Sequence, residues 1–426
     1  MKSPFKIAVV GLWHLGEIYS AGLAELGHTV IGLDTNKTTV KNFQKNIPAL
    51  AEPHLDVMLA SNKNAGRLSF TDDFKQVKDC NVLWLTLDTP VTSTDKARVQ
   101  VVYSAINKAL PHLKSGALIV ISSQMPVGTS AKLMEVIRKK YPQRSFGYVY
   151  TPENLQLGEA VRCFMEPGRI VVGADGDASF AKMQKIFQKL NTTLLRMSPT
   201  SAEMVKHALN SFLATSLSFT YDLAYLWEKV GVDILDVSKA LRSDPRIGHK
   251  AYIDANIGFS GGTLGRDLQF LLASAKAHGI KMPVIASVFK KNSERKAIVY
   301  TRLAESLGSL KNKTIGILGL TYKAGTSTLR RSLALDLMKD LKSMGANLQL
   351  HDPMVKRSGF FDNVYDAVKG CHAVLVVTPW AELRTADLKR MKSAMKEPAV
   401  LFDTRNFFAG QETELKKFGF NYLGVG

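Results

Sequence analysis

The residues with the clearest chemical meaning are two glycines and an aspartate near the start of the chain. Gly11 and Gly16 lie in the stretch VVGLWHLG, between an apolar run and a helical pattern, and Asp34 ends the next apolar run. Gly11 permits a tight turn, Gly16 lets a helix approach the strands, and the amides at the helix start suit a pyrophosphate. Asp34 is placed to accept hydrogen bonds from an adenosine ribose, and its charge favours NAD over NADP. Together these residues predict a dinucleotide site.

The middle glycine of the GxGxxG pattern is missing, because Trp13 occupies its position. That glycine normally lets the backbone touch the pyrophosphate, so we expect NAD to be displaced slightly or held more by the two glycines and the aspartate. We assign the neighbouring His14 and Leu15 to the cofactor site as well. The alternative, a purely structural turn, is weakened by the strand, the helix and the acidic residue that accompany the motif.

The composition is that of a globular protein, with 46% hydrophobic and 22% charged residues among 426. No apolar run reaches the roughly 20 residues of a membrane helix and no secretory signal is visible, so we expect no membrane association and a cytoplasmic protein. The formal net charge is +19, with lysines and arginines scattered along the chain. This pattern favours an anionic substrate over nucleic acid. The three cysteines, Cys80, Cys163 and Cys371, are far apart and indicate neither a disulfide framework nor a metal site.

The elements that must position these residues follow from apolar runs that alternate with helical patterns. In the first half the runs are KIAVVGL, HTVIGLD, NVLWLTL, ALIVISS and RIVVGAD. The alternation starts again after Lys311, with KTIGILGL, NLQLHDP, HAVLVVTP and AVLFDTRN. This order is typical of parallel sheets with helices on both faces.

The middle of the chain has a different pattern. Residues from about 201 to 239 carry apolar side chains at helical spacing without a proline, which predicts a long helix buried between domains or subunits. We therefore predict an α/β protein in which a central helical segment, residues 200–305, joins two doubly wound, Rossmann-like parallel-sheet domains, residues 1–199 and 306–426.

Further motifs occur in order along the chain. SSQMPVGT, residues 122–129, is similar to STVPPGT, and YTPENLQLGEA, residues 150–160, is similar to NPEFLREGxA. EMVKHALNSFLATSLSF, which starts at residue 203, is similar to EMxKYxxNAFLAxKISF, and GLTYKAGTSTLRRS and FDTRN are similar to GLxFKPxTDDxRES and DxRN. These patterns resemble the UDP-glucose/GDP-mannose dehydrogenase family, whose enzymes oxidise a nucleotide-linked sugar alcohol with NAD. The resemblance spans almost the whole chain.

The resemblance assigns catalytic roles to four residues. Glu153 falls on the family's catalytic glutamate, Lys206 and Asn210 on its helix-borne lysine and asparagine, and Asp267 on its active-site aspartate. Lys206 and Asn210 are four residues apart and share one helix face, where an ammonium and an amide stabilise a substrate oxygen as hydride leaves. Asp267 would take the proton directly or through water.

The same resemblance extends the cofactor and substrate sites. For the cofactor it adds a turn near the nicotinamide, the loop after it and one arginine: Thr89, Pro90, Gln124 and Arg330. For the substrate it adds, beside Glu153, Lys206 and Asn210, the residues Leu155, Phe259, Gly261, Lys323 and Arg405, together with Arg246, which matches an arginine that reaches the neighbouring subunit's substrate. Arginine suits this role because its planar fork binds phosphate oxygens in pairs. The resemblance implies a UDP-sugar substrate and a homodimer built across the long helix.

One departure from the family pattern concerns the chemistry itself. GFSGGTLGRD, residues 258–267, aligns with GFGGSCFPKD and places Thr263 at the catalytic cysteine, while Gln124 and Arg266 replace a threonine and a lysine. A threonine hydroxyl needs a dedicated base to act as a nucleophile, whereas a cysteine supplies thiolate more readily. We expect Thr263 to belong to the catalytic site without forming a thioester.

Four outcomes stay open for the reaction. The enzyme oxidises once and releases an aldehyde or ketone, or it oxidises twice through a hydrated carbonyl. It oxidises and re-reduces with retained NAD, as an epimerase does, or it is a pseudoenzyme that binds a nucleotide sugar. We rank a nucleotide-sugar dehydrogenase first because the residues of the first hydride step, Lys206 and Asp267, are retained.

Overall fold

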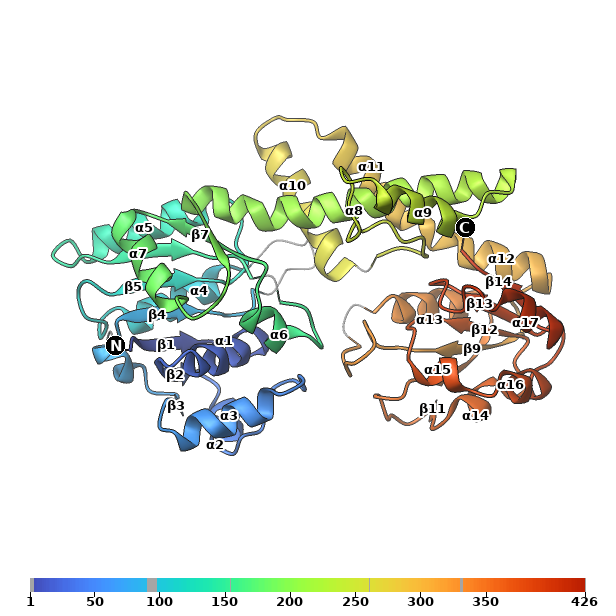
Figure 1. The fold of residues 1–426 in the computed structure, drawn as a ribbon, viewed down its shortest axis with the longest axis horizontal. Coiled ribbons are helices and arrows are strands. Elements are labelled where there is room, and N and C mark those ends of the chain that lie inside the picture. Colours follow the sequence, from blue (N-terminus) through green and yellow to red (C-terminus); the bar gives the residue numbers. More distant parts are fainter. Residues whose placement is uncertain (1–3, 90–97, 154, 260, 330–331, 426) are drawn as a thin grey trace. The chain divides into compact units, whose positions relative to one another are not determined.

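The computed structural model describes residues 4–89, 98–153, 155–259, 261–329 and 332–425. The chain divides into two compact units, Met1–Ala208 and Leu209–Gly426, with the boundary inside the longest helix. Each unit contains one sheet with helices on both faces (Figure 1). This arrangement confirms the predicted fold class, two Rossmann-like sheets with a helical segment between them in the sequence.

The described part of the first unit forms an eight-stranded sheet in the order β3-β2-β1-β4-β5-β6-β7-β8. Its central strands are buried at almost every position, which explains why they appear in the sequence as continuous apolar runs. The strands are β1 (Lys6–Val10), β2 (Thr29–Leu33), β3 (Leu68–Thr71), β4 (Val82–Leu85), β5 (Leu118–Ile121), β6 (Gly147–Tyr150), β7 (Arg169–Ala174) and β8 (Thr193–Met197).

Two apolar layers hold the helices of the first unit against this sheet. One layer contains side chains of α1 (His14–Glu25), α2 (Lys37–Gln44), α3 (Leu55–Asn64), α6 (Ala160–Met165) and α7 (Asp177–Ile186). The opposite layer contains side chains of the 3₁₀ turn η1 (Phe74–Asp79), α4 (Gln100–Ala109) and α5 (Thr129–Lys140), with Ala202 from the start of the long helix α8 (Pro199–Val230). The sheet is therefore covered on both faces.

One strand pair departs from the parallel arrangement that the sequence pattern predicts. β7 runs antiparallel to β6, while β8 runs parallel to β7. The chain leaves β6 at Tyr150 and enters β7 at Arg169 from the same edge of the sheet, so the connection begins and ends at that edge. This is the edge where the other parallel strands end. The connection therefore brings Glu153 to the side of the sheet that carries the turns after β1, β4 and β5.

Within its described residues, the second unit contains a six-stranded sheet, all of it parallel, in the order β11-β10-β9-β12-β13-β14. Its strands are β9 (Thr314–Leu318), β10 (Asn347–His351), β11 (Phe360–Phe361), β12 (Ala373–Val376), β13 (Val400–Asp403) and β14 (Asn421–Leu423). Apolar side chains of α12 (Ala297–Leu307) and α13 (Leu333–Ser343) cover one face. Those of α14 (Val364–Val368), α15 (Glu382–Thr385), α16 (Leu388–Ala394) and α17 (Glu412–Lys417) cover the other.

The remaining helices lie between the two sheets in the sequence. They are the greater part of α8, then α9 (Ile234–Ser243), a π-helical turn η2 (Gly261–Gly265), α10 (Arg266–Ala277) and α11 (Pro283–Arg295). A small core joins Leu217 and Tyr221 of α8 to Leu268 of α10 and Val288 of α11. This packing fixes the start of α10, where Asp267 lies, against α8.

Candidate active site

The turn after β1 has the geometry that a dinucleotide requires. Gly11 has a φ of +100°, and a Cβ at this position would lie 2.8 Å from the Leu87 side chain. A Cβ at Gly16 would lie 1.7 Å from the carbonyl oxygen of Gly11. Both positions therefore admit only glycine, and the helix start of α1 approaches the strand closely. The first amides of α1 have no acceptor within the helix and are suited to bind a pyrophosphate.

Trp13 and Asp34 complete this turn. Trp13 has an extended backbone with a φ of −99°, so its conformation does not require the missing glycine, and its side chain is 48% exposed. Asp34 is half-buried at the end of β2, and its two oxygens accept hydrogen bonds of 2.8 Å from the amides of Leu12 and Asn36. His14 and Leu15 follow as the first residues of α1. The residues present therefore fit NAD, with an indole where the family motif has no side chain.

The two loops assigned to the nicotinamide contact each other. The buried Thr89 hydroxyl donates a 2.7 Å hydrogen bond to the carbonyl oxygen of Gln124. The loop after Gln124 is held by α8, because Glu203 accepts hydrogen bonds from the amides of Gly128, at 2.6 Å, and Ser130, at 2.7 Å. Burial raises the pKa of Glu203 above its ordinary value, although these hydrogen bonds oppose the shift. Pro90 and Arg330 lie outside the described residues.

Glu153 and Lys206 form an ion pair in the first unit. The Lys206 ammonium lies 3.0 Å from Glu153 Oε1 and 2.9 Å from the Glu153 carbonyl oxygen, and Lys206 is buried. The other carboxylate oxygen of Glu153 accepts from the Leu155 amide at 2.9 Å. Burial alone would raise the pKa of Glu153, but the charge and hydrogen bond of Lys206 lower it below its ordinary value. Lys206 therefore lies beside an ionised carboxylate.

Asn210 and Asp267 form the corresponding pair in the second unit. The Asn210 amide donates to Asp267 Oδ2, and both side chains are buried. Thr263 is half-buried in the η2 turn, four residues before Asp267, and Gly261 begins that turn. Phe259 is buried, and its backbone exchanges two hydrogen bonds with the side chain of Asn292. The asparagine and the aspartate that the sequence predicts therefore do meet.

The residues of the second sheet that the sequence assigns to the substrate follow the carboxyl ends of its strands. Lys323 is exposed in the segment after β9, and Arg405 is half-buried after β13, with its Nε 3.4 Å from the Val377 carbonyl oxygen. β12 lies between these two strands. Arg246 is exposed and forms two hydrogen bonds with Asp244, at 3.0 and 2.7 Å, which raise the pKa of the arginine. Lys323 and Arg405 thus share one edge of the sheet.

The described cysteines lie outside the segment where the family has its nucleophile. Cys80 and Cys371 are buried, and burial raises the pKa of their thiols to about 11 and about 12. A thiol with such a pKa is a poor nucleophile at neutral pH. Cys163 is half-buried on α6. None of the three occupies the sequence position of the family's cysteine, where this chain has Thr263.

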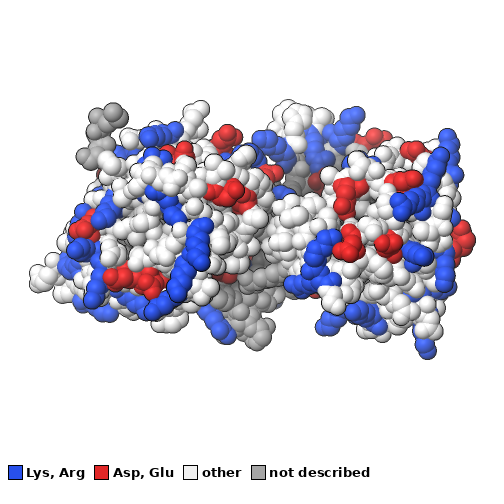
Figure 2. Space-filling view, turned by 90° about the horizontal axis from the view of Figure 1, so that it is seen from below, with Lys and Arg blue, Asp and Glu red and all other residues white. Residues whose placement is uncertain are grey.

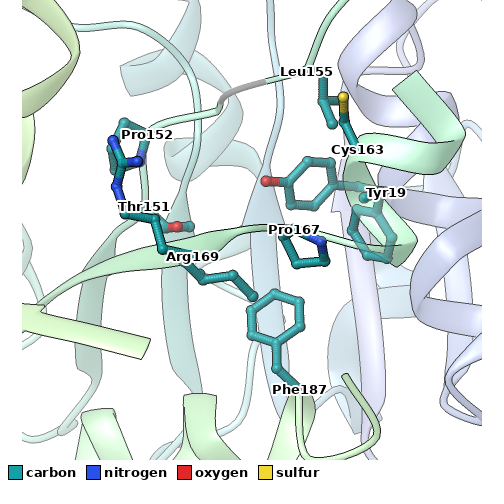
Figure 3. A pocket seen from close by; sticks show the side chains of 10 residues that line it. Tyr19, Thr151, Pro152, Leu155, Cys163, Pro167, Arg169 and Phe187 are labelled. Atoms are coloured by element: carbon teal, nitrogen blue, oxygen red, sulfur yellow. The ribbon is translucent and has the colours of Figure 1, made fainter. Parts of the chain in front are cut away.

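A cavity of about 50 Å³ lies against Thr151, Pro152 and Leu155, the sequence neighbours of Glu153 (Figure 3). Thr151, Pro152 and Leu155 form part of its wall, together with Tyr19, Cys163, Phe164, Pro167, Arg169, Ile170 and Phe187. This volume holds one or two water molecules and is far below the several hundred Å³ of a usual ligand pocket. A volume of this size does not accommodate a nucleotide sugar.

Three further observations concern the surface charge, the helices and possible metal ligands. On the face drawn in Figure 2, lysines and arginines are interspersed with acidic side chains and do not gather into one patch. Among the described helices, none is long and apolar enough to cross a membrane. Within the same described residues, no group of three or more His, Cys, Asp and Glu side chains is arranged to hold a metal ion.

Comparisons with known proteins decide the family. Residues 5–191 match the NAD binding domain of the UDP-glucose/GDP-mannose dehydrogenase family, residues 200–294 its central domain and residues 316–410 its UDP binding domain. UDP-glucose 6-dehydrogenase TuaD of Bacillus subtilis (strain 168) is 30% identical over 432 residues, which cover 99% of this chain and 93% of that protein. The chain belongs to the UDP-glucose/GDP-mannose dehydrogenase family.

Other members of the family agree in sequence and in structure. UDP-glucose 6-dehydrogenase of Rhizobium meliloti (strain 1021) is 31% identical, with 99% of each chain covered. A UDP-glucose dehydrogenase from the hyperthermophilic archaeon Pyrobaculum islandicum superposes with a TM-score of 0.90 at 26% identity, over 100% of this chain and 98% of that one. These findings confirm NAD as the cofactor and a nucleotide-sugar dehydrogenase, an oxidoreductase that acts on a CH–OH group.

Three residues that hold the loop after Gln124 and the Glu153 segment in place were not identified from the sequence. Glu203 fixes the loop after Gln124, and His207, whose Nε2 lies 3.2 Å from the Met125 carbonyl oxygen, supports the same loop. Glu52 contacts both His14 and the end of the Glu153 segment. Glu203 and His207 lie in the EMVKH stretch beside Lys206, which was a usable signal. Glu52 is distant in sequence from both its partners, so no local pattern could reveal it.

Proposed function

We propose that this enzyme oxidises the sugar alcohol of a UDP-linked sugar by hydride transfer to NAD, without a cysteine thioester step. One observation carries the proposal: Thr263 stands at the family's cysteine position, while Lys206, Asn210 and Asp267 are retained in hydrogen-bonded pairs. The first oxidation needs charge stabilisation and a proton acceptor, and only a thioester needs the thiol.

Lys206 and Asn210 stabilise the developing negative charge in this proposal. They lie four residues apart on α8, so their side chains leave the helix on the same face. Glu153 orients the Lys206 side chain through the 3.0 Å ion pair. An ammonium and an amide donor aimed at the substrate oxygen lower the energy of the alkoxide-like transition state.

Asp267 takes the proton of the sugar hydroxyl, directly or through one water. Its Oδ2 accepts from the Asn210 amide, so the carboxylate is oriented before substrate arrives. When bound, NAD supplies the hydride acceptor. Gly11, Gly16 and Asp34 hold and orient the dinucleotide, and Thr89 and Gln124 lie at its nicotinamide end. Lys323 and Arg405 bind the diphosphate of the substrate by charge-assisted hydrogen bonds.

The stoichiometry of NADH tests the reaction. Purified protein is given NAD and a limiting amount of each UDP-, GDP- or dTDP-sugar, and both NADH and the sugar product are measured. We expect NADH with a UDP-sugar. One NADH per sugar indicates a released carbonyl, and two indicate a second oxidation through its hydrate. A changed sugar without net NADH supports an epimerase, and binding of sugar and NAD without any turnover supports a pseudoenzyme.

A pair of variants at Thr263 tests the missing thioester. In Thr263→Cys the thiol is restored at the family position, so a trapped thioester and a higher NADH yield per sugar are expected. Thr263→Ser is the matched control and should resemble the unaltered enzyme. A covalent sugar adduct on the unaltered protein, detected by mass spectrometry, would contradict the proposal.

We also propose a homodimer that forms across α8. Phe212, Phe219 and Leu226 are 70%, 54% and 55% exposed and follow one another at seven-residue intervals, so they form one apolar face. Exposed apolar side chains at this spacing suit a helix–helix contact with a second copy, and the exposed Arg246 would then serve the partner's substrate. Phe219→Glu should yield a monomer in analytical ultracentrifugation; a variant that stays dimeric excludes this face.

The ranges of the three family matches support a division into domains 1–199, 200–305 and 306–426. We propose that the first binds NAD, the second carries the dimer contact and the third binds the nucleotide sugar. A cytoplasmic location agrees with the soluble substrates of this reaction.

A further inference from the structure

A buried carboxylate, Glu52, joins two segments that bind different ligands in the proposed function. Its Oε1 lies 2.8 Å from His14 Nε2 and accepts from the Gly158 amide at 2.8 Å, and its Oε2 accepts from the Ala160 amide at 3.1 Å. His14 is the first residue of α1, in the cofactor turn. Gly158 and Ala160 end the segment that begins with Glu153. All of these residues belong to the first compact unit.

The contacts of Glu52 favour its ionised form. Burial alone would raise the pKa of Glu52, but the hydrogen bonds from His14, Gly158 and Ala160 lower it below its ordinary value. Glu52 is therefore an ionised acceptor at neutral pH, and His14 donates to it from Nε2. Gly158 has a φ of +81°, a conformation that favours glycine, so this amide is aimed at Glu52 by a specific backbone turn.

The segment that carries Glu52 is itself fastened to α1. Glu17 is fully buried on α1, and its carboxylate accepts from the amides of Ala49, at 2.7 Å, and Leu50, at 3.3 Å. Residues 49–52 are therefore fixed to α1 at one end, and contact residues 158–160 at the other. A displacement of the α1 start would move Glu52, and Glu52 would move the amides of Gly158 and Ala160.

We propose that Glu52 is a positioning residue that couples the two ligands, so that NAD at the α1 turn and the nucleotide sugar at the Glu153 segment tighten each other's binding. This inference rests on the proposed function. Coupling between two binding sites is reciprocal, so it can be measured from either ligand. Such coupling can be distinguished from a merely structural role. A loss of structure would weaken the binding of each ligand by itself, but it would leave unchanged the factor by which one ligand tightens the binding of the other.

The test uses NADH and UDP-glucose, a pair that forms a ternary complex without turnover. The dissociation constant of NADH is measured by fluorescence with and without saturating UDP-glucose. In the unaltered enzyme, UDP-glucose should lower the dissociation constant of NADH by about fivefold or more. In Glu52→Gln this factor should fall to about one, because an amide has a single acceptor oxygen and would turn an N–H group toward Gly158 or Ala160.

A second variant and a control keep the test decisive. His14→Phe removes the bond to Glu52 but leaves the contacts of Glu52 with residues 158–160, and it should abolish the coupling equally. The double variant should show no further loss, as expected for two residues that act through one contact. Glu25→Gln is the control, since Glu25 accepts from Asn62 and joins α1 to α3 without contact to the Glu153 segment. It should keep the coupling factor of the unaltered enzyme.

The outcomes separate this inference from the proposed function. If both ligands bind and the unaltered enzyme shows no coupling, or Glu52→Gln and His14→Phe keep it, the role of Glu52 is overturned. If Glu25→Gln also loses the coupling, general loosening of α1 explains the effect and the inference is likewise overturned. If neither NADH nor UDP-glucose binds, the proposed function fails and the inference falls with it.

Discussion

The turns after β1 and β9 share one pattern of hydrogen bonds but differ in what they can bind. In each, a glycine with positive φ donates its amide to the carbonyl oxygen at the end of the neighbouring strand: Gly11 to Leu33 and Gly319 to His351, both at 2.9 Å. In each, an aspartate after that strand accepts from the amide that follows the glycine. Asp34 accepts from Leu12 at 2.8 Å, and Asp352 accepts from Leu320 at 2.7 Å.

The two aspartates differ in what remains available for a ligand. Asp34 is half-buried and accepts two amides. Asp352 is fully buried, and its donors are the amides of Leu320, Thr321 and Met354, the Thr321 hydroxyl and the Trp380 indole. α1 begins directly after the first turn, whereas in the second unit the next described helix, α13, begins at Leu333. The first turn can therefore receive a ribose and a pyrophosphate, while the second aspartate holds the sheet edge together.

The largest effect is expected at Lys206, which lies in neither of these two turns. A variant at this position distinguishes the chemical step from nucleotide binding. Lys206→Ala removes the ammonium beside Glu153 and should lower turnover by about 10³-fold. NADH binding, measured by fluorescence, should change little. Unaltered turnover, or turnover and NADH affinity lost together, would contradict the assignment of Lys206 to the chemical step.

The next effect tests the structural role of the second aspartate. Asp352→Ala leaves several buried donors without an acceptor and should lower the free energy of unfolding by about 3 kcal/mol or more. Chemical denaturation monitored by circular dichroism measures the change. A variant as stable as the unaltered protein would show that this carboxylate is not structural.

A smaller effect concerns Glu17, the buried carboxylate of the first unit. Burial raises its pKa to about 7 from an ordinary value of 4.5. The folded protein thus holds this proton more tightly than the unfolded chain, and the stability present below pH 4.5 is lost as pH rises through 7. Charged groups facing it are His14 and Glu52.

Glu17→Gln should therefore stabilise the protein at pH 8 by about 2 kcal/mol and flatten the dependence of stability on pH between 5 and 7. The glutamine oxygen can still accept from the Ala49 and Leu50 amides. Denaturation curves recorded across this pH range provide the measurement. A Glu17→Gln variant that loses stability at pH 8 would indicate that the ionised carboxylate is required.

The smallest effect concerns Asp34 and is measured as a change in NADH binding. Asp34→Ala removes the acceptor for the adenosine ribose and should weaken NADH binding about tenfold, since a hydrogen bond to a charged group contributes roughly 1.5–3 kcal/mol. Its effect on unfolding should be clearly smaller than that of Asp352→Ala. If Asp34→Ala destabilises the protein as much and binds NADH normally, the two aspartates have the same structural role.

Much of the fold and part of the site could be predicted from local sequence. Buried parallel strands require continuous apolar runs, so KIAVVGL and KTIGILGL identified the first strand of each sheet. The glycines at positions 11 and 16 were recognisable because only glycine fits there. The antiparallel direction of β7 was not predictable, because RIVVGAD has the same apolar pattern in either orientation.

The residue types of the site are readable directly from the sequence: an intact lysine, asparagine and aspartate, a threonine where the family has a thiol, and a tryptophan in the glycine turn. Which side chains meet became clear from the fold. Glu52 is 38 residues from His14 and 106 from Gly158, and Asn210 is 57 from Asp267. Local propensities act over a few residues, whereas these contacts depend on strand order and helix packing. The same physical reason leaves Asp34 half-buried and Asp352 fully buried, although each simply ends a β-strand in the sequence.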